Sequence, residues 1–336
     1  SSPPTFIYVG GVFLKLLFRE IVNKAISKNA SDIHFIPSVD EVHIKFRIND
    51  YLELYEIFNL DVYQKLLVFM KFKSGLDVSS QQSAQSGRYT YQSKSTFYLR
   101  ISTLPLSLGI ESCVIRIIPQ YFQAKKEYKE FNDFKHLVNK KQGLILLTGP
   151  TGSGKSTLMY QMVLHAYKEL NLNVITIENP VEQLLKGITQ ISINKKAGID
   201  YISSFKAILR CDPDIILIGE IRDAEVAKCV IQASLSGHLV LSTMHSTNCR
   251  GALLRLLEMG ISIQELTQSI NIISNQRLIT TTQNERRLIC ETIDKMQIQY
   301  FFEHEQTMPH DFNNLQQQLN LLSKEGTICE DTASKY

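Results

Sequence analysis

The stretch Gly143-Leu-Ile-Leu-Leu-Thr148, followed by Gly149-Pro150-Thr151-Gly152-Ser153-Gly154-Lys155-Ser156-Thr157, decides the fold of this chain. Its first part is an apolar run of the kind that forms a buried strand, and residues 149–156 fit the pattern G-x-x-x-x-G-K-[ST]. Residues 157–170 predict a helix. Strand, loop and helix in this order are the context in which such a loop binds phosphate, so a glycine-rich turn without a ligand is the weaker interpretation.

Each part of the loop has a physical reason for its residue type. The glycines let successive backbone N–H groups turn inward around an anion, and the start of the following helix adds its positive end. Lys155 supplies a positive charge for the phosphates, and Ser156 supplies a hydroxyl that can ligate magnesium. We therefore expect ATP and Mg²⁺ as cofactors, with residues 149–157 as the nucleotide-binding segment.

A second strand ends in a carboxylate. Ile215-Ile-Leu-Ile-Gly219-Glu220 is a buried apolar run that would place Glu220 beside the loop of Lys155. There Glu220 could polarise the attacking water and hold magnesium through water. Taken alone, an exposed carboxylate at a strand end is an equally good interpretation, and the upstream loop favours the catalytic one.

The second half of the chain alternates apolar runs with helical patterns. Its candidate strands are residues 143–148, 173–177, 214–218 and 238–243. This rhythm predicts an α/β fold with a parallel-rich sheet over residues 131–336, ended by C-terminal helices. Asp311 is the expected N-cap of a late helix that carries Leu315, Leu319 and Leu322 on one face.

The first half predicts a smaller α+β domain over residues 12–118. An amphipathic helix opens it, and residues 41–48 alternate strictly between apolar and polar, as a half-buried strand does. Residues 1–11 precede any pattern and are expected to be disordered. Pro119 and a cluster of charges place a linker at residues 119–130.

Composition narrows the class of protein. The 336 residues are 44% hydrophobic and 21% charged, with a formal net charge of +3, which is too weak a basic balance for direct nucleic-acid binding. The six cysteines are scattered, so neither a disulfide framework nor a zinc ribbon is indicated, and a reducing compartment fits best. The early apolar run, residues 12–18, is too short to span a membrane.

Four further motifs, taken with the phosphate loop, resemble the ATPases of type II secretion, type IV pili and competence pseudopili, most closely those of the late-competence kind. The resemblance covers about residues 18–290 and rests on Ala30-Ser-Asp-Ile-His-Phe35, Thr176-Ile-Glu-Asn-Pro-Val-Glu182, Ile218-Gly-Glu-Ile-Arg-Asp223 and Gly237-His-Leu-Val-Leu-Ser-Thr-Met-His245. It implies a RecA-like P-loop ATPase domain preceded by the smaller, PAS-like α+β domain.

The resemblance also implies which side chains surround the nucleotide. These are Glu178 and Glu182 of the acidic motif and the histidines His238 and His245. By residue chemistry alone, two histidines at this spacing would more often be structural, and the resemblance favours the catalytic interpretation. Asn179 departs from the family, which has aspartate there, so slower catalysis is expected.

Arginines should offset the charge that spreads over the terminal phosphate. By resemblance, Arg88, Arg100 and Arg116 match first-domain arginines that a closing ring delivers, and we expect Arg100 and Arg116 to do so first. Three more match family positions, where an ion-pair role is as good an interpretation as phosphate contact: Arg210, Arg222 and Arg277.

Partners and location follow from the resemblance alone. It implies a homo-hexamer, cytoplasmic and peripheral at the inner face of the membrane, which acts on a polytopic platform protein to assemble a pseudopilus for DNA uptake. Work in a type IV pilus or in type II secretion is an alternative, as is a nucleotide-gated scaffold with little turnover.

The four-cysteine zinc insert of larger relatives is replaced by residues 280–287, with only Cys290 nearby, so zinc is not expected.

Overall fold

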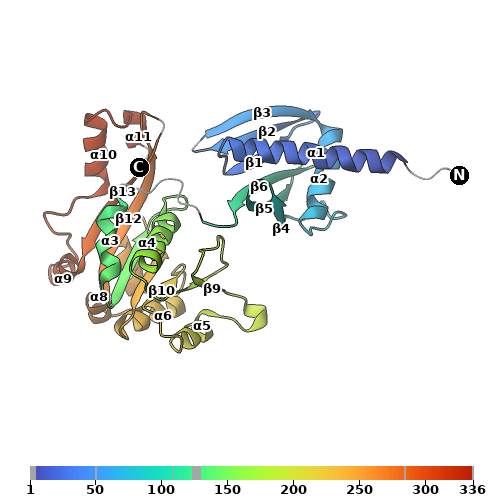
Figure 1. Cartoon of the computed structure of the whole chain (residues 1–336). Helices are drawn as coiled ribbons and strands as arrows, with labels where there is room; N and C mark the ends of the chain where they lie inside the picture. The colour runs from blue at the N-terminus through green and yellow to red at the C-terminus, as the bar shows by residue number, and fades with distance from the viewer. Residues whose placement is uncertain (1–4, 50, 108, 123–129, 284, 335–336) are drawn as a thin grey trace. The chain divides into compact units, whose positions relative to one another are not determined.

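The chain divides into two compact units, Ser1–Tyr121 and Phe122–Tyr336 (Figure 1). The computed structural model describes residues 5–49, 51–107, 109–122, 130–283 and 285–334. The boundary between the units falls within the stretch predicted as a linker, residues 119–130, of which residues 123–129 lie outside the described part.

The first unit combines two helices with a six-stranded antiparallel sheet of order β3-β2-β1-β6-β5-β4. In chain order its elements are α1 (Thr5–Ser27), β1 (Asp32–Pro37), β2 (Glu41–Ile48), β3 (Tyr51–Asn59), α2 (Leu60–Lys73), β4 (Gln85–Gln92), β5 (Thr96–Pro105) and β6 (Glu111–Pro119).

Both helices pack on one face of this sheet. The apolar positions Val42, Ile44 and Phe46 of β2 are 0% exposed and lie in the same hydrophobic cluster as Phe18 of α1 and Leu66 of α2. The period-two alternation read from the sequence thus separates a helix-covered apolar face from a polar face. That polar face carries the arginines of β4, β5 and β6.

Helix α1 begins at Thr5, so the expected disorder of residues 1–11 is wrong for residues 5–11. Residues 1–4 of that prediction lie outside the described part of the chain. Gly10 and Gly11 interrupt the apolar spacing in the sequence, but a helix tolerates each glycine at a cost of about 1 kcal/mol relative to alanine. The helix therefore extends backwards through a segment that shows no helical pattern.

The second unit is a seven-stranded sheet with helices on both faces. Its elements are α3 (Phe131–Lys135), η1 (His136–Asn139), β7 (Gly143–Thr148), α4 (Lys155–Glu169), β8 (Val174–Glu178), β9 (Thr189–Ser192), η2 (Lys195–Ala197), α5 (Tyr201–Ile208), β10 (Ile215–Ile218), α6 (Ala224–Leu235), β11 (Leu239–Met244), α7 (Cys249–Glu258), α8 (Ile263–Ser269), β12 (Ile270–Thr280), β13 (Arg286–Asp294), α9 (Lys295–Glu303), α10 (Leu315–Lys324) and α11 (Glu330–Ser334).

The sheet order is β13-β12-β7-β11-β10-β8-β9, in which β13 is antiparallel to β12 and the other neighbours are parallel. Successive residues of β7 pack in opposite clusters: Leu144 and Leu146 face α6 and α7, while Ile145 and Leu147 face α3 and α4. Burial on both faces explains the uninterrupted apolar run. The carboxyl ends of the parallel strands meet at one edge of the sheet, where the phosphate loop follows β7.

Glu291 of β13 ties two helices together. The residue is 3% exposed, and its carboxylate accepts the backbone N–H of Cys249, the first residue of α7, at 2.7 Å and that of Leu315, the first residue of α10, at 3.1 Å. The N-terminal ends of both helices favour this buried negative charge. The N-cap of α10 is Asn314, whose side chain accepts from the N–H of Gln317, and not Asp311 as predicted.

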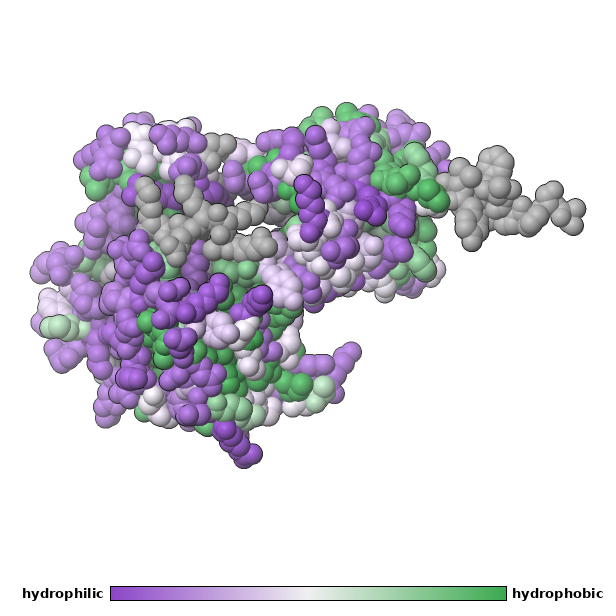
Figure 2. Space-filling model, viewed as in Figure 1, coloured by the Kyte–Doolittle hydropathy of each residue, from purple (hydrophilic) through white to green (hydrophobic). Residues whose placement is uncertain are grey.

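The surface of the first unit carries exposed apolar side chains. Figure 2 shows hydrophobic colour on α1 and along β3, where Phe13, Leu16, Leu54 and Ile57 are 56%, 61%, 53% and 46% exposed. Among the described residues, every helix is too short or too polar to pass through a lipid bilayer.

Candidate functional site

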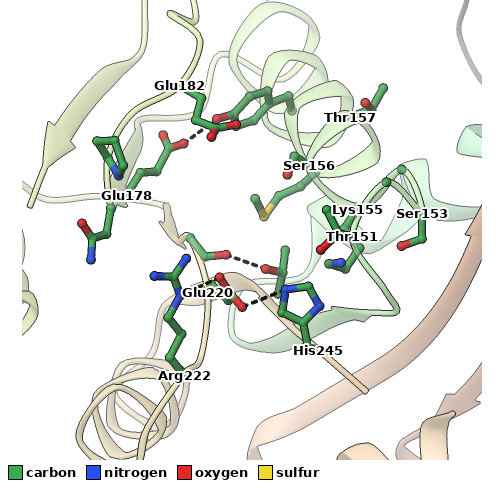
Figure 3. A pocket seen from close by; sticks show the side chains of 18 of the residues that line it. Thr151, Ser153, Lys155, Ser156, Thr157, Glu178, Glu182, Glu220, Arg222 and His245 are labelled. Carbon is green, nitrogen blue, oxygen red and sulfur yellow. Dashed lines mark hydrogen bonds and ion pairs between the residues drawn. The ribbon is translucent and has the colours of Figure 1, made fainter. Parts of the chain in front are cut away.

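A pocket of about 440 Å³ opens at the carboxyl edge of the parallel strands in the second unit (Figure 3). It brings together residues that follow β7, β8, β10 and β11 in the chain. Its lining includes these predicted site residues: Thr151, Gly152, Ser153, Gly154, Lys155, Ser156, Thr157, Glu178, Glu182, Glu220 and His245. Open parallel sheets bind ligands at this edge.

The phosphate loop has the backbone shape that its glycines permit. Gly154, the residue before α4, has φ of 89°, a left-handed conformation that other residues adopt only with strain. A Cβ on Gly149 would lie 2.6 Å from the carbonyl oxygen of Gln276 and 2.7 Å from Oγ of Ser153. The loop is thus packed against β12 on one side, and the start of α4 lines the pocket on the other, where its positive end favours an anion.

Lys155 is buried within this loop. Its Nζ donates to the carbonyl oxygens of Gly149 and Pro150, each at 2.8 Å. Burial lowers the pKa of Lys155 to about 8, helped by the positive charge of Arg277 and opposed by the carboxylate of Glu220. The ammonium group is thus poorly solvated and gains from an anionic ligand more than an exposed lysine would.

Glu220 lies between two basic side chains. Its Oε2 accepts from Nε of Arg222 at 2.7 Å, and its Oε1 lies 3.2 Å from Nε2 of His245 (Figure 3). The other ring nitrogen of His245, Nδ1, lies 3.2 Å from the carbonyl oxygen of Gly149. His245 therefore links the carboxylate to the first residue of the phosphate loop.

The oxygen donors of the pocket fit magnesium. Mg²⁺ is held in nucleotide sites by one or two protein oxygens, with phosphates and water completing the octahedron. The hydroxyl of Ser156 and the carboxylate of Glu220 line the same pocket and supply such oxygens. No cluster of three or more His, Cys, Asp or Glu side chains suited to a metal is found in the described ranges, and magnesium at a triphosphate needs none.

Glu178 forms the opposite wall, and both oxygens of its carboxylate accept hydrogen bonds. The residue is 6% exposed, Thr176 Oγ1 donates to its Oε1 at 2.7 Å, and Gln190 Nε2 donates to the same oxygen at 3.1 Å. The hydroxyl of Tyr160 donates to Oε2. Glu182, from the same acidic motif, is exposed and also lines the pocket.

His238 does not lie in the pocket. It precedes β11, whereas His245 follows it, so a whole strand of about 20 Å separates the two rings at a rise of about 3.3 Å per residue. His238 Nδ1 lies 3.1 Å from Oγ of Ser236, at the opposite edge of the sheet. The prediction that both histidines surround the nucleotide is therefore corrected for His238.

The arginines predicted to reach the phosphates belong to the first unit. Cross-strand pairing places Arg100 of β5 directly between Arg88 of β4 and Arg116 of β6. The guanidinium of Arg88 stacks on the ring of Tyr98, with 3.4 Å between Cζ and the ring centroid, and Nε of Arg116 donates to Asp32 at 2.9 Å. These three side chains form a basic row across the polar face of the antiparallel sheet.

Substitutions at the two histidines should separate their roles. We expect His245→Ala to lower ATP turnover about tenfold, because Glu220 loses a neighbour that helps to place its carboxylate. His238→Ala should change turnover less than about twofold, since its ring lies a strand away from the pocket. Phosphate release by the two purified variants checks this, and equal losses would contradict the placement of His238.

Sequence reasoning missed the residues that position the acidic wall. Tyr160 and Gln190 approach Glu178 from α4 and β9. For Tyr160, the available signal was a polar hydroxyl on the buried face of the helix that follows the phosphate loop, since such a group requires a partner. For Gln190, no spacing in the sequence indicates the contact.

The sequence and the fold of the chain are both similar to those of known proteins. The chain is 38% identical to "Competence protein ComGA" of Bacillus subtilis over 271 residues, which covers 78% of this chain and 75% of that protein. Its fold matches the structure of the ATPase DotB of Legionella pneumophila with a TM-score of 0.78 and 18% identity, covering 95% of each chain. It matches the pilus retraction motor PilT with bound ADP at 0.66 and 26% identity, covering 94% of this chain and 95% of that one.

A family model spans nearly the whole sequence. The family described as "Type II/IV secretion system protein" matches residues 10–330, and this range covers most of both units and every residue that lines the pocket. The chain belongs to the Type II/IV secretion system protein family.

Proposed function

We propose that this chain is a motor that hydrolyses ATP to drive the assembly of a competence pseudopilus for DNA uptake. Its family and its relatives make it an ATPase of the secretion type. The observation that carries the catalytic part is the placement of Lys155 and Glu220 in one pocket, where Lys155 follows β7 and Glu220 follows β10, two parallel strands with β11 between them.

The pocket residues divide the work of hydrolysis. The loop N–H groups and Lys155 bind the phosphates, and Glu220 directs water at the terminal phosphorus and takes up its proton. His245 and Arg222 place the carboxylate of Glu220. Magnesium, held by Ser156 and reached by Glu220 through water, would neutralise charge on the phosphate oxygens.

The small domain supplies the remaining positive charge in this proposal. A homo-hexameric ring would close Arg100 and Arg116 over the terminal phosphate and reopen on product release, so that domain motion is the mechanical output. The basic row on β4, β5 and β6 supports this role. The RecA-like and PAS-like identities of the two domains belong to the same proposal.

The proposal also includes a partner protein and a location in the cell. The motor would work in the cytoplasm at the inner face of the membrane, on a polytopic platform protein. The similarity to a competence protein supports DNA uptake. The apolar side chains exposed on α1 and β3 support contact with another protein, because exposed apolar surface marks interaction sites.

Two alternatives remain as competing proposals. The family description and the likeness to a pilus retraction motor favour work in type II secretion or a type IV pilus with the same catalytic residues. Asn179, which lines the pocket as a neutral amide, favours a nucleotide-gated scaffold with little turnover. Steady-state phosphate release by the purified protein separates the scaffold from the motor.

One experiment in cells tests the biological role. Lys155→Ala is introduced into the source cell, and transformation, protein secretion and surface pili are scored separately, with Lys168→Ala as the matched control. We expect transformation to be lost and the other two to be retained. Loss of secretion or pili with normal transformation would overturn the competence assignment.

A further inference from the structure

Tyr160 connects the helix of the phosphate loop to the acidic wall of the pocket. It lies on α4, which begins at Lys155, and its hydroxyl donates to Oε2 of Glu178 on β8. Tyr160 is 4% exposed and Glu178 is 6% exposed, so solvent offers neither group a ready replacement. The contact therefore joins two elements that line the pocket through a single buried hydrogen bond.

The tyrosine is held in place from behind. Its ring packs edge-on against Phe122, with 5.2 Å between the centroids and an interplanar angle of 77°. Phe122 is itself fixed, because its backbone N–H donates to the carbonyl oxygen of Leu184 at 2.9 Å. A ring packed in this way restricts where its hydroxyl can point.

The hydroxyl also stays protonated. Burial, followed by the nearby negative charge of Glu178, raises the pKa of Tyr160 well above its ordinary range. Tyr160 is therefore a donor at every pH at which the protein is folded, and a donor is what a carboxylate needs. Hydrogen bonds to charged acceptors are about twice as strong as those between neutral groups.

The number of acceptor positions on Glu178 indicates what this arrangement is for. A carboxylate accepts about four hydrogen bonds. Thr176 and Gln190 both donate to Oε1, and Tyr160 donates to Oε2. One acceptor position on Oε2 remains beyond these three bonds, on a residue that lines the pocket.

We propose that Tyr160 is a positioning residue for ATP hydrolysis, which holds Glu178 so that Oε2 offers its remaining acceptor position to a water or ligand group in the pocket. This inference rests on the proposed function, because it requires that the pocket hydrolyses ATP, and it adds Glu178 to the residues that take part in turnover. Tyr160 itself touches no reacting atom. It acts through the orientation of Glu178, with Thr176 and Gln190 fixing the other oxygen.

Removal of the hydroxyl alone tests the inference. Tyr160→Phe retains the ring that packs against Phe122, and Tyr167→Phe, which removes the hydroxyl of an exposed residue on the same helix outside the pocket, is the matched control. We expect Tyr160→Phe to lower kcat about tenfold with KM for ATP within about twofold, the range for one lost hydrogen bond to a charged group. The control should retain both constants.

A double-mutant cycle with Glu178→Gln separates positioning from packing. If Tyr160 acts through Glu178, Tyr160→Phe should change kcat less than about twofold in the Glu178→Gln background. A tenfold further loss in that background would show independent action and overturn the inference. Thr176→Val, which removes a donor to the other carboxylate oxygen, should show the same non-additivity and serves if Tyr160→Phe lowers the unfolding temperature.

The same set of variants distinguishes this inference from the proposed function. If Glu178→Gln lowers kcat and Tyr160→Phe does not, only the inference about Tyr160 fails. If Glu178→Gln turns over at the rate of the unaltered protein, the inference fails and ATP hydrolysis by the pocket stands. Absence of phosphate release from the unaltered protein would instead contradict the proposed function.

Discussion

Lys155→Ala should abolish tight nucleotide binding and, with it, ATP hydrolysis. The ammonium group is the buried positive charge of the phosphate loop, and its two present acceptors are the backbone carbonyls of Gly149 and Pro150. Phosphate oxygens carry full negative charge and are far better partners for it. We expect affinity for ATP to fall at least about a hundredfold in equilibrium titrations.

The matched control is Lys168→Ala, which removes an exposed lysine from the same helix, α4. It should bind ATP as the unaltered protein does. Binding by Lys155→Ala with unchanged affinity would contradict the assignment of the whole loop.

The affinity for ATP should also depend on pH through Lys155. Since burial lowers the pKa of Lys155 to about 8, the side chain is an ammonium below that pH and a neutral amine above it in the absence of ligand. Affinity for ATP should therefore decline as the pH rises through about 8. The Lys155→Ala variant should lack this decline, and titrations from pH 7 to about pH 9.5 compare the two proteins.

Glu220→Gln should separate binding from hydrolysis. The amide has the size of the carboxylate but no negative charge, so it cannot take up the proton of the attacking water. We expect ATP affinity within a fewfold of the unaltered protein and phosphate release at least about a hundredfold slower.

The control for this variant is Glu225→Gln, on the exposed face of α6 shortly after Glu220 in the chain. It should retain full turnover. Ordinary turnover by Glu220→Gln, measured on protein freed of contaminating ATPases, would refute the role of the strand-end carboxylate.

The central strands and the phosphate loop could be predicted because they depend on local sequence. The four strands predicted in the second half correspond to β7, β8, β10 and β11, with bounds that differ by at most one residue. Burial on both faces requires an apolar run in each of them, and the loop has glycines where its backbone adopts positive φ. Such signals lie within a few neighbouring residues and need no tertiary structure.

The two histidines show where local reasoning fails. His238 and His245 stand in one motif, and the resemblance placed both at the nucleotide. Because β11 runs between them, they lie at opposite edges of the sheet. A motif that contains a whole strand spans the sheet, so its two ends cannot serve the same pocket within one unit.

The acidic wall shows a different limit. Glu178 is predicted as a site residue, but its partners Tyr160 and Gln190 come from other elements. Gln190 reaches the carboxylate because β9 pairs with β8, a contact that exists only after folding. Side-chain partners across a sheet have no fixed spacing in the sequence, and so no sequence pattern predicts them.

The carboxylate of Glu291 connects one of the last helices to the core of the second unit. Its two backbone partners belong to α7, which follows the loop of His245, and to α10, near the carboxyl end. A shortened chain that stopped before Leu315 would lose the hydrogen bond from its N–H to this carboxylate, and a bond to a charged group contributes about 1.5–3 kcal/mol. Through Glu291, α10 is connected to α7, so removal of α10 should destabilise the start of the helix that follows His245.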